Sequence, residues 1–179
     1  MPNPVLIHRT FANANASGAV LGPPVLWLEQ ALNDDYFSGA TYAQNIQNTS
    51  GVPLTIYKTS IYVSPTGTNG TAIGQVRTNS QPTTGVQYGG DSGVTSYVGG
   101  SGLQYLDMVW SSNYPVIPAN TDFYIVFART SAPASGFNVQ AKYVHPGGPY
   151  AGTSYGLFVT TDPTPAADYD MRFRIYVFS

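Results

Sequence analysis

The sequence contains no cysteine. This absence excludes a disulfide framework, a thiolate zinc site and a thiol nucleophile, so the domain must rely on its hydrophobic core. Charge is also scarce, because charged residues make up 9% of the 179 residues, against about 25% in an ordinary soluble protein. Solubility must therefore come from Ser, Thr, Asn, Gln and Gly, and a weakly charged surface of this kind tolerates close association with partners.

The chain lacks any run of Lys or Arg, and its formal net charge is -2. Phosphate backbones require a basic footprint, so we expect no nucleic-acid partner. No stretch approaches the roughly 20 apolar residues of a membrane helix, so we expect no membrane partner. The first residues also lack the basic region and the apolar run of about 7 to 15 residues that form a signal peptide, so we expect no export by a cleaved signal.

Residues for acid-base and nucleophilic chemistry are few. Glu29 is the one glutamate, and His8 and His145 are the two histidines. Most aspartates lie at strand ends or in turns, where their side chains bond to backbone N–H groups. Neither histidine lies in a Gly-x-Ser-x-Gly context or at a spacing that binds zinc. We therefore predict no catalytic residue and no enzymatic activity.

Calcium is the metal for which the sequence offers candidate ligands. These are "NDD" at 33–35 and "DYD" at 168–170. Neither segment matches the spacing of an EF-hand loop, and a pair of aspartates in a turn usually only forms the turn. "GGDSG" at 89–93 lacks the lysine that follows a phosphate-binding glycine loop. We predict no metal and no cofactor.

What the sequence does contain is a β pattern. Tyr, Thr, Val, Ile and Phe dominate the periodic segments, and Gly, Pro, Asn and Ser interrupt them roughly every 8 to 12 residues. Long helical patterns are absent. The pattern predicts an all-β fold, an antiparallel two-sheet sandwich with jelly-roll-like topology and about eight or nine strands. We expect one domain over residues 1–179, with an extended N-terminal arm at 1–24.

Several segments allow local predictions. "VLWLEQALNDD" at 25–35 fits either a short helix or a strand. The segments at 41–48 and 54–64 are separated by "TSGVP" and are typical of a hairpin. "DFYIVFAR" at 122–129 is apolar on both faces, as a central strand would be.

Two further predictions concern backbone geometry. The apolar positions in 54–64 change parity, which indicates a bulge near Lys58 or burial of both faces. In the turn at 65–72, Asn69 followed by Gly70 is a strong signal for positive φ.

The last strand carries a cluster of charge. In "ADYDMRFRIYVFS" at 167–179, alternation places Met171, Phe173, Ile175 and Val177 on the core face. Asp168, Asp170, Arg172, Arg174 and Tyr176 share the opposite face. Neighbours on one face of a strand lie about 7 Å apart, so we expect Arg172 and Arg174 to pair with residues of adjacent strands.

Aromatic residues are the remaining unusual feature, at 13% of the chain with fourteen tyrosines. Residues 79–102 form a long Gly-rich loop, and loops of this length are usually functional or disordered. Tyr combines a rigid ring with a polar tip, which suits sugar stacking, protein interfaces and the capping of a sandwich core alike. The candidate ligand or interface residues in or near such loops are Tyr88, Tyr97, Trp110, Tyr114, Tyr150 and Tyr155.

Three segments carry a resemblance to a known group of domains. They are "NTSGVPLTIYKTSIYVSPTGTNGTAIGQV" (48–76), "IPANTDFYIVFARTS" (117–131) and "PYAGTSYGLFVTTDPTPAADYDMRFRIYV" (149–177). Together they resemble jelly-roll accessory modules. Such modules occur in tailed-phage virion proteins, both head decoration and tail proteins, and as carbohydrate-binding or anchoring modules of secreted enzymes. The resemblance extends over about two thirds of the chain and assigns no role to a particular residue.

Between these settings, the length, low charge and lack of cysteine favour a particle component. We expect a non-enzymatic virion structural protein of a tailed phage, a capsid decoration or cement protein that is assembled in the host cytoplasm. Its partners would be capsid or tail proteins and further copies of itself. The alternative is an extracellular carbohydrate-binding module or receptor-binding tail protein, in which loop Tyr and Trp rings stack on a glycan.

Overall fold

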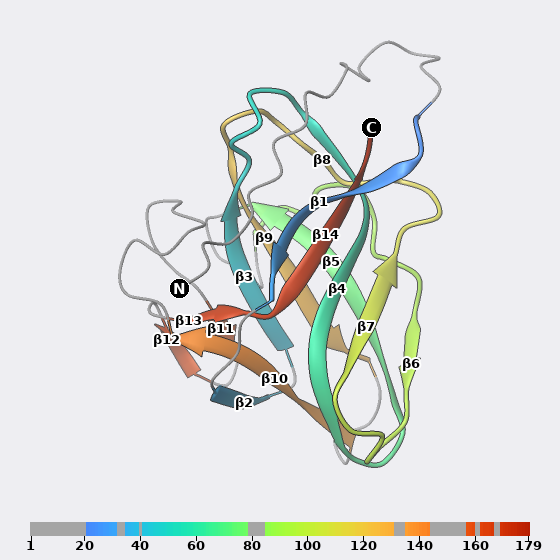
Figure 1. Cartoon of the computed structure of the whole chain (residues 1–179), viewed down its shortest axis with the longest axis vertical. Coiled ribbons are helices and arrows are strands. Elements are labelled where there is room, and N and C mark those ends of the chain that lie inside the picture. Colours follow the sequence, from blue (N-terminus) through green and yellow to red (C-terminus); the bar gives the residue numbers. More distant parts are fainter. Residues whose placement is uncertain are drawn as a thin grey trace.

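The computed structural model describes residues 21–31, 35–39, 41–78, 85–130, 135–143, 157–159, 162–166 and 169–179. These residues form fourteen strands in two antiparallel sheets and no helix (Figure 1). No membrane-spanning helix is therefore present in the described part of the chain. The predicted all-β fold and two-sheet sandwich are confirmed, and the arrangement is compatible with a jelly roll. Most of the predicted arm at 1–24 lies outside the described residues.

Sheet A contains eight strands. They are β1 (Pro24–Gln30), β2 (Asp35–Gly39), β4 (Leu54–Gly67), β7 (Gln104–Val109), β8 (Val116–Ile117), β10 (Ser135–Tyr143), β13 (Tyr169–Met171) and β14 (Phe173–Phe178). Sheet B contains six strands in the order β12 (Asp162–Ala166), β11 (Leu157–Val159), β3 (Thr41–Gln47), β9 (Asp122–Arg129), β5 (Gly70–Thr78) and β6 (Thr95–Tyr97). Eight of these fourteen strands have six residues or more, and the others are short segments.

Strand β4 is the centre of sheet A. Its middle part pairs with β14 and with β7 over the same residues, so these two strands must lie on opposite sides of β4. Strand β1 pairs with the far side of β14. The sheet therefore has four neighbouring strands in the order β1, β14, β4 and β7, and their outward side chains share one surface.

The core lies between the two sheets. The four inward residues predicted for the last strand are fully buried, which confirms its alternation: Met171, Phe173, Ile175 and Val177. The opposite wall of the core comes mainly from β3, β5 and β9. Strand β9 is buried on both faces, as predicted for a central strand, because Tyr124 and Val126 pack with Ala43 away from the main core.

The change of parity in 54–64 allowed a bulge near Lys58 or burial of both faces, and the structure contains the bulge. The pairing of β4 with β14 runs from Tyr176 opposite Lys58 directly to Val177 opposite Ile56, so Tyr57 is the extra residue. An extra residue in one strand reverses which face the following side chains occupy. The bulge therefore lets Ile56 and Ile61, at different parities, both point into the core.

The predicted hairpin between 41–48 and 54–64 is wrong. Strand β3 belongs to sheet B and β4 to sheet A, so the turn carries the chain across the sandwich. Asn48 holds this crossing, because its buried Nδ2 donates to the carbonyl oxygens of Val52 and Pro118, each at 2.8 Å. Both strands contribute apolar side chains to the same core. Two strands in opposite sheets produce this apolar pattern as well as the two strands of a hairpin do, so the pattern did not distinguish them.

The prediction of positive φ at Asn69 and Gly70 is also wrong. Strand β4 runs on to Gly67, which takes the left-handed conformation with φ of 75°. Gly70 instead begins β5 and pairs with Tyr97. The segment at 25–35, for which helix and strand were both open, contains strand β1.

Candidate functional site

Two of the predicted ligand residues are core residues. Trp110 is 0% exposed and Tyr97 is 3% exposed, and both belong to the main apolar cluster. Trp110 Nε1 donates to the Gly90 carbonyl oxygen at 2.7 Å, which satisfies its polar atom. A buried ring has no face on which a sugar can stack. The two residues therefore do not have the exposed position that was expected of ligand or interface residues.

The other predicted ligand residues divide into two groups. Tyr88 and Tyr114 are half-buried at the margin of the core. Tyr150 and Tyr155 lie outside the described residues.

The described part of the Gly-rich loop, from residue 85 onward, is held against β5 by backbone hydrogen bonds. Tyr88 N donates to the Val76 oxygen at 2.8 Å, and Ser92 N donates to the Gly74 oxygen at 2.9 Å. Gly93 N reaches the other sheet, where it donates to the Val109 oxygen of β7. This part of the loop closes one side of the sandwich between β5 and β7.

The glycine content of this segment has a packing cause at Gly89. Its φ is 64°, and a Cβ atom there would lie 2.3 Å from the Asn113 carbonyl oxygen. Only glycine fits both the conformation and the space. Packing therefore accounts for the glycine at this position.

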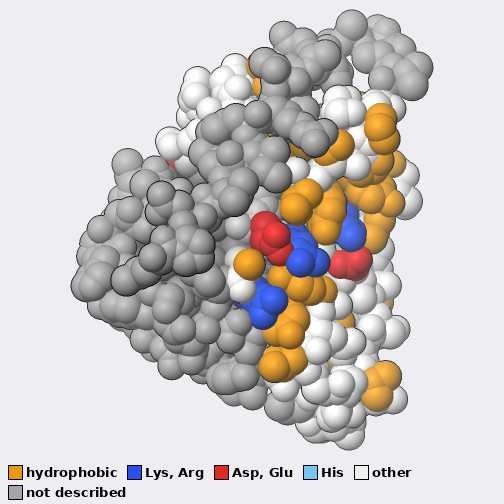
Figure 2. All heavy atoms as spheres, viewed as in Figure 1, with side chains coloured by type: hydrophobic (Ala, Val, Ile, Leu, Met, Phe, Trp, Pro, Cys, Tyr) orange, Lys and Arg blue, Asp and Glu red, His pale blue; other side chains and the backbone are white. Residues whose placement is uncertain are grey.

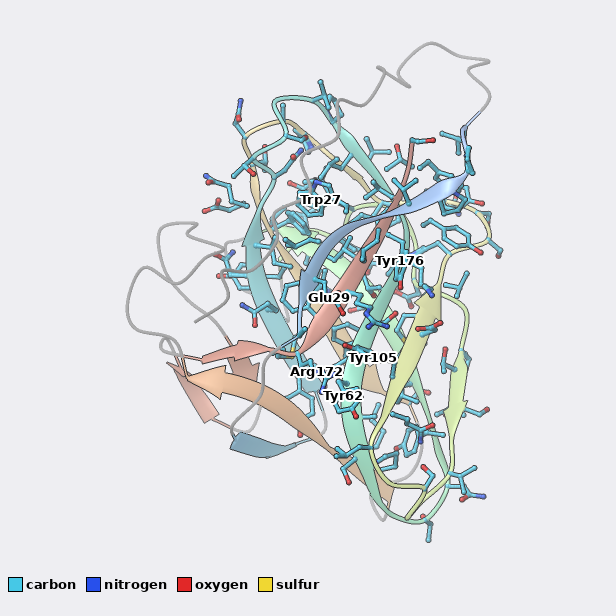
Figure 3. All side chains as sticks on the ribbon, in the orientation of Figure 1. Trp27, Glu29, Tyr62, Tyr105, Arg172 and Tyr176 are labelled. Carbon is cyan, nitrogen blue, oxygen red and sulfur yellow. The ribbon has the colours of Figure 1, made fainter. Side chains whose placement is uncertain are left out.

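A polar and aromatic surface lies on the outer face of sheet A, which we call the Arg–Tyr face. Figure 2 shows cationic and acidic side chains gathered in the middle of this side of the molecule among side chains coloured as hydrophobic, a class that includes tyrosine. Figure 3 shows the labelled members of the face spread across β1, β14, β4 and β7, with Tyr176 above Tyr105 and Tyr62. The face consists of Glu29, Lys58, Ser60, Tyr62, Tyr105, Asp107, Arg172, Arg174 and Tyr176.

Charge is concentrated on this face. It holds five of the nine charged side chains that the structure describes, and the four elsewhere are Arg77, Asp91, Asp122 and Arg129. In a chain with so little charge, this concentration distinguishes the Arg–Tyr face from the other described surfaces.

Arg174 is the best-anchored cation of the face. Its Nε donates to Glu29 Oε1 at 2.6 Å, and its guanidinium lies 4.0 Å from the centre of the Tyr105 ring. Burial acts most strongly on the pKa of Arg174 and lowers it, but the hydrogen bond to Glu29 and the charges of Tyr105, Glu29 and Tyr176 together raise the pKa above its ordinary value. Arg174 is therefore charged at any physiological pH.

The rest of the Arg174 guanidinium remains available. Its side chain is 33% exposed. In the part of the chain that the structure describes, no acceptor is bonded to its two Nη groups. A guanidinium presents its N–H groups as a planar fork that matches a carboxylate, so Arg174 offers a positioned site for one.

Lys58 and Asp107 form the second ion pair of the face. Lys58 Nζ lies 2.9 Å from Asp107 Oδ2 and 4.1 Å from the centre of the Tyr176 ring. Asp107 Oδ1 accepts a hydrogen bond from Ser60 Oγ at 2.6 Å. The Asp107 side chain is 48% exposed, against 20% for Lys58, so the carboxylate is the more accessible partner.

Arg172 joins two tyrosines at the lower end of the face. Its guanidinium lies 3.8 Å from the centre of the Tyr62 ring, and its Nε donates to the Tyr105 hydroxyl at 3.2 Å. The two rings meet edge to face at a centroid distance of 4.8 Å. Each cation of the face is thus stacked on a tyrosine.

The aromatic surface continues beyond the upper end of the face. Phe178 contacts Tyr57 at a centroid distance of 5.3 Å and Tyr114 at 4.9 Å. Tyr114, one of the predicted interface residues, therefore borders the Arg–Tyr face.

The sequence predicted only part of this surface. The expectation that residues of adjacent strands would partner the terminal arginines is confirmed for Arg174 by Glu29 of β1. The role of Tyr62, Tyr105 and Tyr176 was missed. The sequence did contain a sign of this surface, because polar or aromatic residues occupy every second position of three strands. Alternation does not reveal which strands are neighbours, so this sign could not show that the residues meet.

The described residues include no group of three or more His, Asp or Glu side chains arranged to hold a metal ion. The side chains of the two calcium candidates, at 33–35 and 168–170, lie outside the described residues. What the Arg–Tyr face offers is stacked cations, hydroxyl groups and an exposed carboxylate.

No protein-family model matches this sequence, and no curated protein is detectably similar to it.

Proposed function

We propose that this protein is a non-enzymatic structural protein that acts through protein–protein contacts made by the Arg–Tyr face. The observation that carries the proposal is the stacking of Lys58, Arg172 and Arg174 on Tyr176, Tyr62 and Tyr105. Tyr and Arg are enriched among the residues that contribute most to binding at protein interfaces.

The stacking also lowers the cost of binding. A free lysine or arginine side chain loses about 0.5 to 1.5 kcal/mol of conformational entropy when an interface immobilises it. Arg174 is already held by Glu29 and Tyr105, and Arg172 by Tyr62 and Tyr105. Much of this ordering therefore precedes binding, which favours a surface adapted for association.

The setting that we propose is the virion of a tailed phage, with the protein as a capsid decoration or cement protein assembled in the host cytoplasm. Support comes from the sandwich fold, the low charge and the sequence resemblance to jelly-roll modules of virion proteins. Capsid or tail proteins would be its partners. A protein that works in a repeating particle needs little affinity per contact, because many contacts act together.

A glycan-binding function is the second candidate, and one observation favours it. The exposed Asp107 carboxylate lies on the same face as the Tyr62 and Tyr105 rings, so hydrogen bonds to sugar hydroxyls and ring stacking could combine there. Against it, guanidinium groups already cover the rings of Tyr62 and Tyr105 on one side. The burial of Tyr97 and Trp110 also removes two stacking candidates.

The proposal is tested on particles purified from cells that carry the gene. Mass spectrometry should detect the chain in the particles at a constant ratio to their major protein. Purified protein should rebind to particles that lack it, and Arg172→Ala or Tyr62→Ala should weaken rebinding about tenfold or more. The matched control, Gln75→Ala on sheet B, should rebind normally.

The opposite result is equally clear. Absence of the chain from particles, together with specific binding on a glycan array that Tyr62→Ala and Asp107→Asn abolish, would replace the structural function with glycan binding.

A further inference from the structure

We infer that the Arg–Tyr face pairs with the same face of a second copy of this chain. The twofold axis would lie between the two faces, parallel to the strands, and pass over Ser60 of β4. This inference rests on the proposed function, because it assumes that the face makes protein contacts, and it names one partner. Its basis is the order of charges across the sheet.

The register of the strands sets this order. The pairing places Glu29 beside Arg174, Arg174 beside Ser60 and Ser60 beside Asp107. These four residues form one row across β1, β14, β4 and β7. Neighbouring strands lie about 4.8 Å apart, so Arg174 and Asp107 stand at equal distances on the two sides of Ser60.

A twofold axis over Ser60 exchanges these two positions. Arg174 then faces Asp107 of the second copy, and Asp107 faces Arg174 of that copy. A symmetric dimer requires such reciprocal contacts. If residue i of the first copy contacts residue j of the second, then residue j of the first copy must contact residue i of the second. In this row, the Nη groups of Arg174 can donate to a further partner, and the exposed carboxylate of Asp107 can accept from one.

The rows on either side are also compatible with this axis. In the row below, Tyr62 meets Tyr62 of the second copy, and Arg172 meets Tyr105 of that copy. In the row above, Tyr176 meets Val109 of the second copy. These contacts pair a ring with a ring, a cation with a ring, and a ring with an aliphatic side chain.

Lys58 is the one residue that would face its own copy unfavourably. It is 20% exposed, and Asp107 neutralises it at 2.9 Å. Packed sheets also cross at about 30°, so the central row stays aligned while the outer rows diverge.

The balance of charge favours a second copy over a strongly anionic partner. The face carries three cations and two carboxylates, and Arg174 and Lys58 are each already paired with a carboxylate. A face with both signs in fixed order is complementary to itself, whereas an anion-binding surface would leave its cations uncompensated.

The area of the face sets the expected strength. Four strands span about 14 Å and six residues along β14 span about 20 Å, so the face covers roughly 300 Å². A stable interface buries about 800 Å² per partner. We therefore expect a weak, concentration-dependent dimer that adds to the other contacts of a particle.

Charge exchange tests the inference directly. Sedimentation equilibrium of the wild-type protein up to about 1 mM should show reversible dimers. Arg174→Glu places Glu opposite Asp107, and Asp107→Lys places Lys opposite Arg174, so each variant alone should dimerise at least about tenfold more weakly. In an equimolar mixture both contacts become attractive again, and heterodimers should form with affinity near that of the wild type.

The control pair lies off the face. Arg77→Glu and Asp91→Lys change charge by the same amounts on the β5 side of the molecule, and they should dimerise like the wild type, alone and mixed. Circular dichroism and thermal unfolding establish that each variant is folded. If a charge-reversed variant does not fold, Arg174→Gln and Asp107→Asn replace it, and each should weaken dimerisation.

Three results would overturn the inference. They are a wild-type protein that remains a monomer at all concentrations, single variants that dimerise as the wild type does, and a mixture that gains no heterodimer. The particle assay distinguishes the two proposals. A monomer that still binds particles through Arg172 and Tyr62 disproves the dimer and leaves the proposed function intact.

Discussion

At the scale of residues, proximity to a loop does not decide whether an aromatic side chain is buried or exposed. Trp110 and Tyr97 lie at or beside Gly- and Ser-containing loops and are buried, whereas Tyr62 and Tyr105 lie within strands and stack with cations at the surface. The difference follows from alternation, since Trp110 continues the inward series of Leu106 and Met108. Parity within a strand is therefore a better guide to exposure than proximity to a loop.

The role of Trp110 in the core gives a stability prediction. Trp110→Ala should lower the free energy of unfolding by about 3 to 5 kcal/mol, because it leaves a cavity and removes the hydrogen bond to Gly90. Tyr88→Ala, at the margin of the core, should cost much less. Urea denaturation followed by circular dichroism measures both, and a fully stable Trp110→Ala protein would contradict the burial.

Two glycines provide a matched comparison at the same scale. Both Gly89 and Gly51 have positive φ, but a Cβ at Gly89 meets the Asn113 oxygen while one at Gly51 meets nothing within 4 Å. Gly51→Ala should cost about 1 to 2 kcal/mol of conformational strain. Gly89→Ala should cost clearly more, because the steric clash adds to the strain. Equal losses in urea denaturation would show that the segment after residue 85 is not packed as described.

At the scale of elements, the bulge in β4 decides which residues face the core. Deleting Tyr57 should reverse the parity of the strand before it, so that Leu54 and Ile56 turn to solvent. Exposing two such side chains costs about 3 to 6 kcal/mol, comparable with the stability of a whole domain. Tyr57→Ala keeps the extra residue and should remain folded. Thermal unfolding and the dispersion of amide NMR signals compare the two, and a folded deletion variant would disprove the role of the bulge.

The ion pair between β1 and β14 is expected to stabilise the fold only slightly. Glu29 and Arg174 are about one third exposed, and pairs of this kind contribute about 0 to 1 kcal/mol. The pKa of Arg174 is raised, so the contribution of its charge is present at neutral pH and is lost on the alkaline side only as the pH rises through the raised value. A double-mutant cycle with Glu29→Gln and Arg174→Gln should therefore give a coupling below about 1 kcal/mol. A coupling of several kcal/mol would show that the pair holds the sheet together.

At the scale of the whole molecule, the described strands pair across long stretches of sequence. Strand β14 pairs with β1 on one side and β4 on the other, and β3 pairs with β9. Non-local pairing slows folding, because the chain must close long loops before the contacts form. We expect refolding in milliseconds to seconds, measured by stopped-flow tryptophan fluorescence. Refolding in microseconds would contradict the topology.

Much of the architecture follows from the sequence itself. Alternation at period two predicted the inward residues of the last strand and the double burial of 122–129, and it gave the bulge near Lys58 as one of two alternatives, because side-chain direction is a local property of an extended chain. The same local pattern predicted no long helix, but at 25–35 it allowed either a short helix or a strand, and the structure has strand β1 there. The pattern failed at the turn after β3, where a hairpin and a crossing between sheets have the same turn residues and the same alternation.

Only the tertiary structure decided which strands are neighbours. Glu29 and Arg174 are separated by most of the chain, and so are Gln44 and Met171, yet each pair is in contact. The alternation of one strand carries no information about the strand beside it, because pairing depends on how all apolar faces share one core. The sequence by itself therefore determined the strands and the side on which each residue lies, and the fold alone brought Arg172 and seven charged or aromatic strand residues together in the Arg–Tyr face.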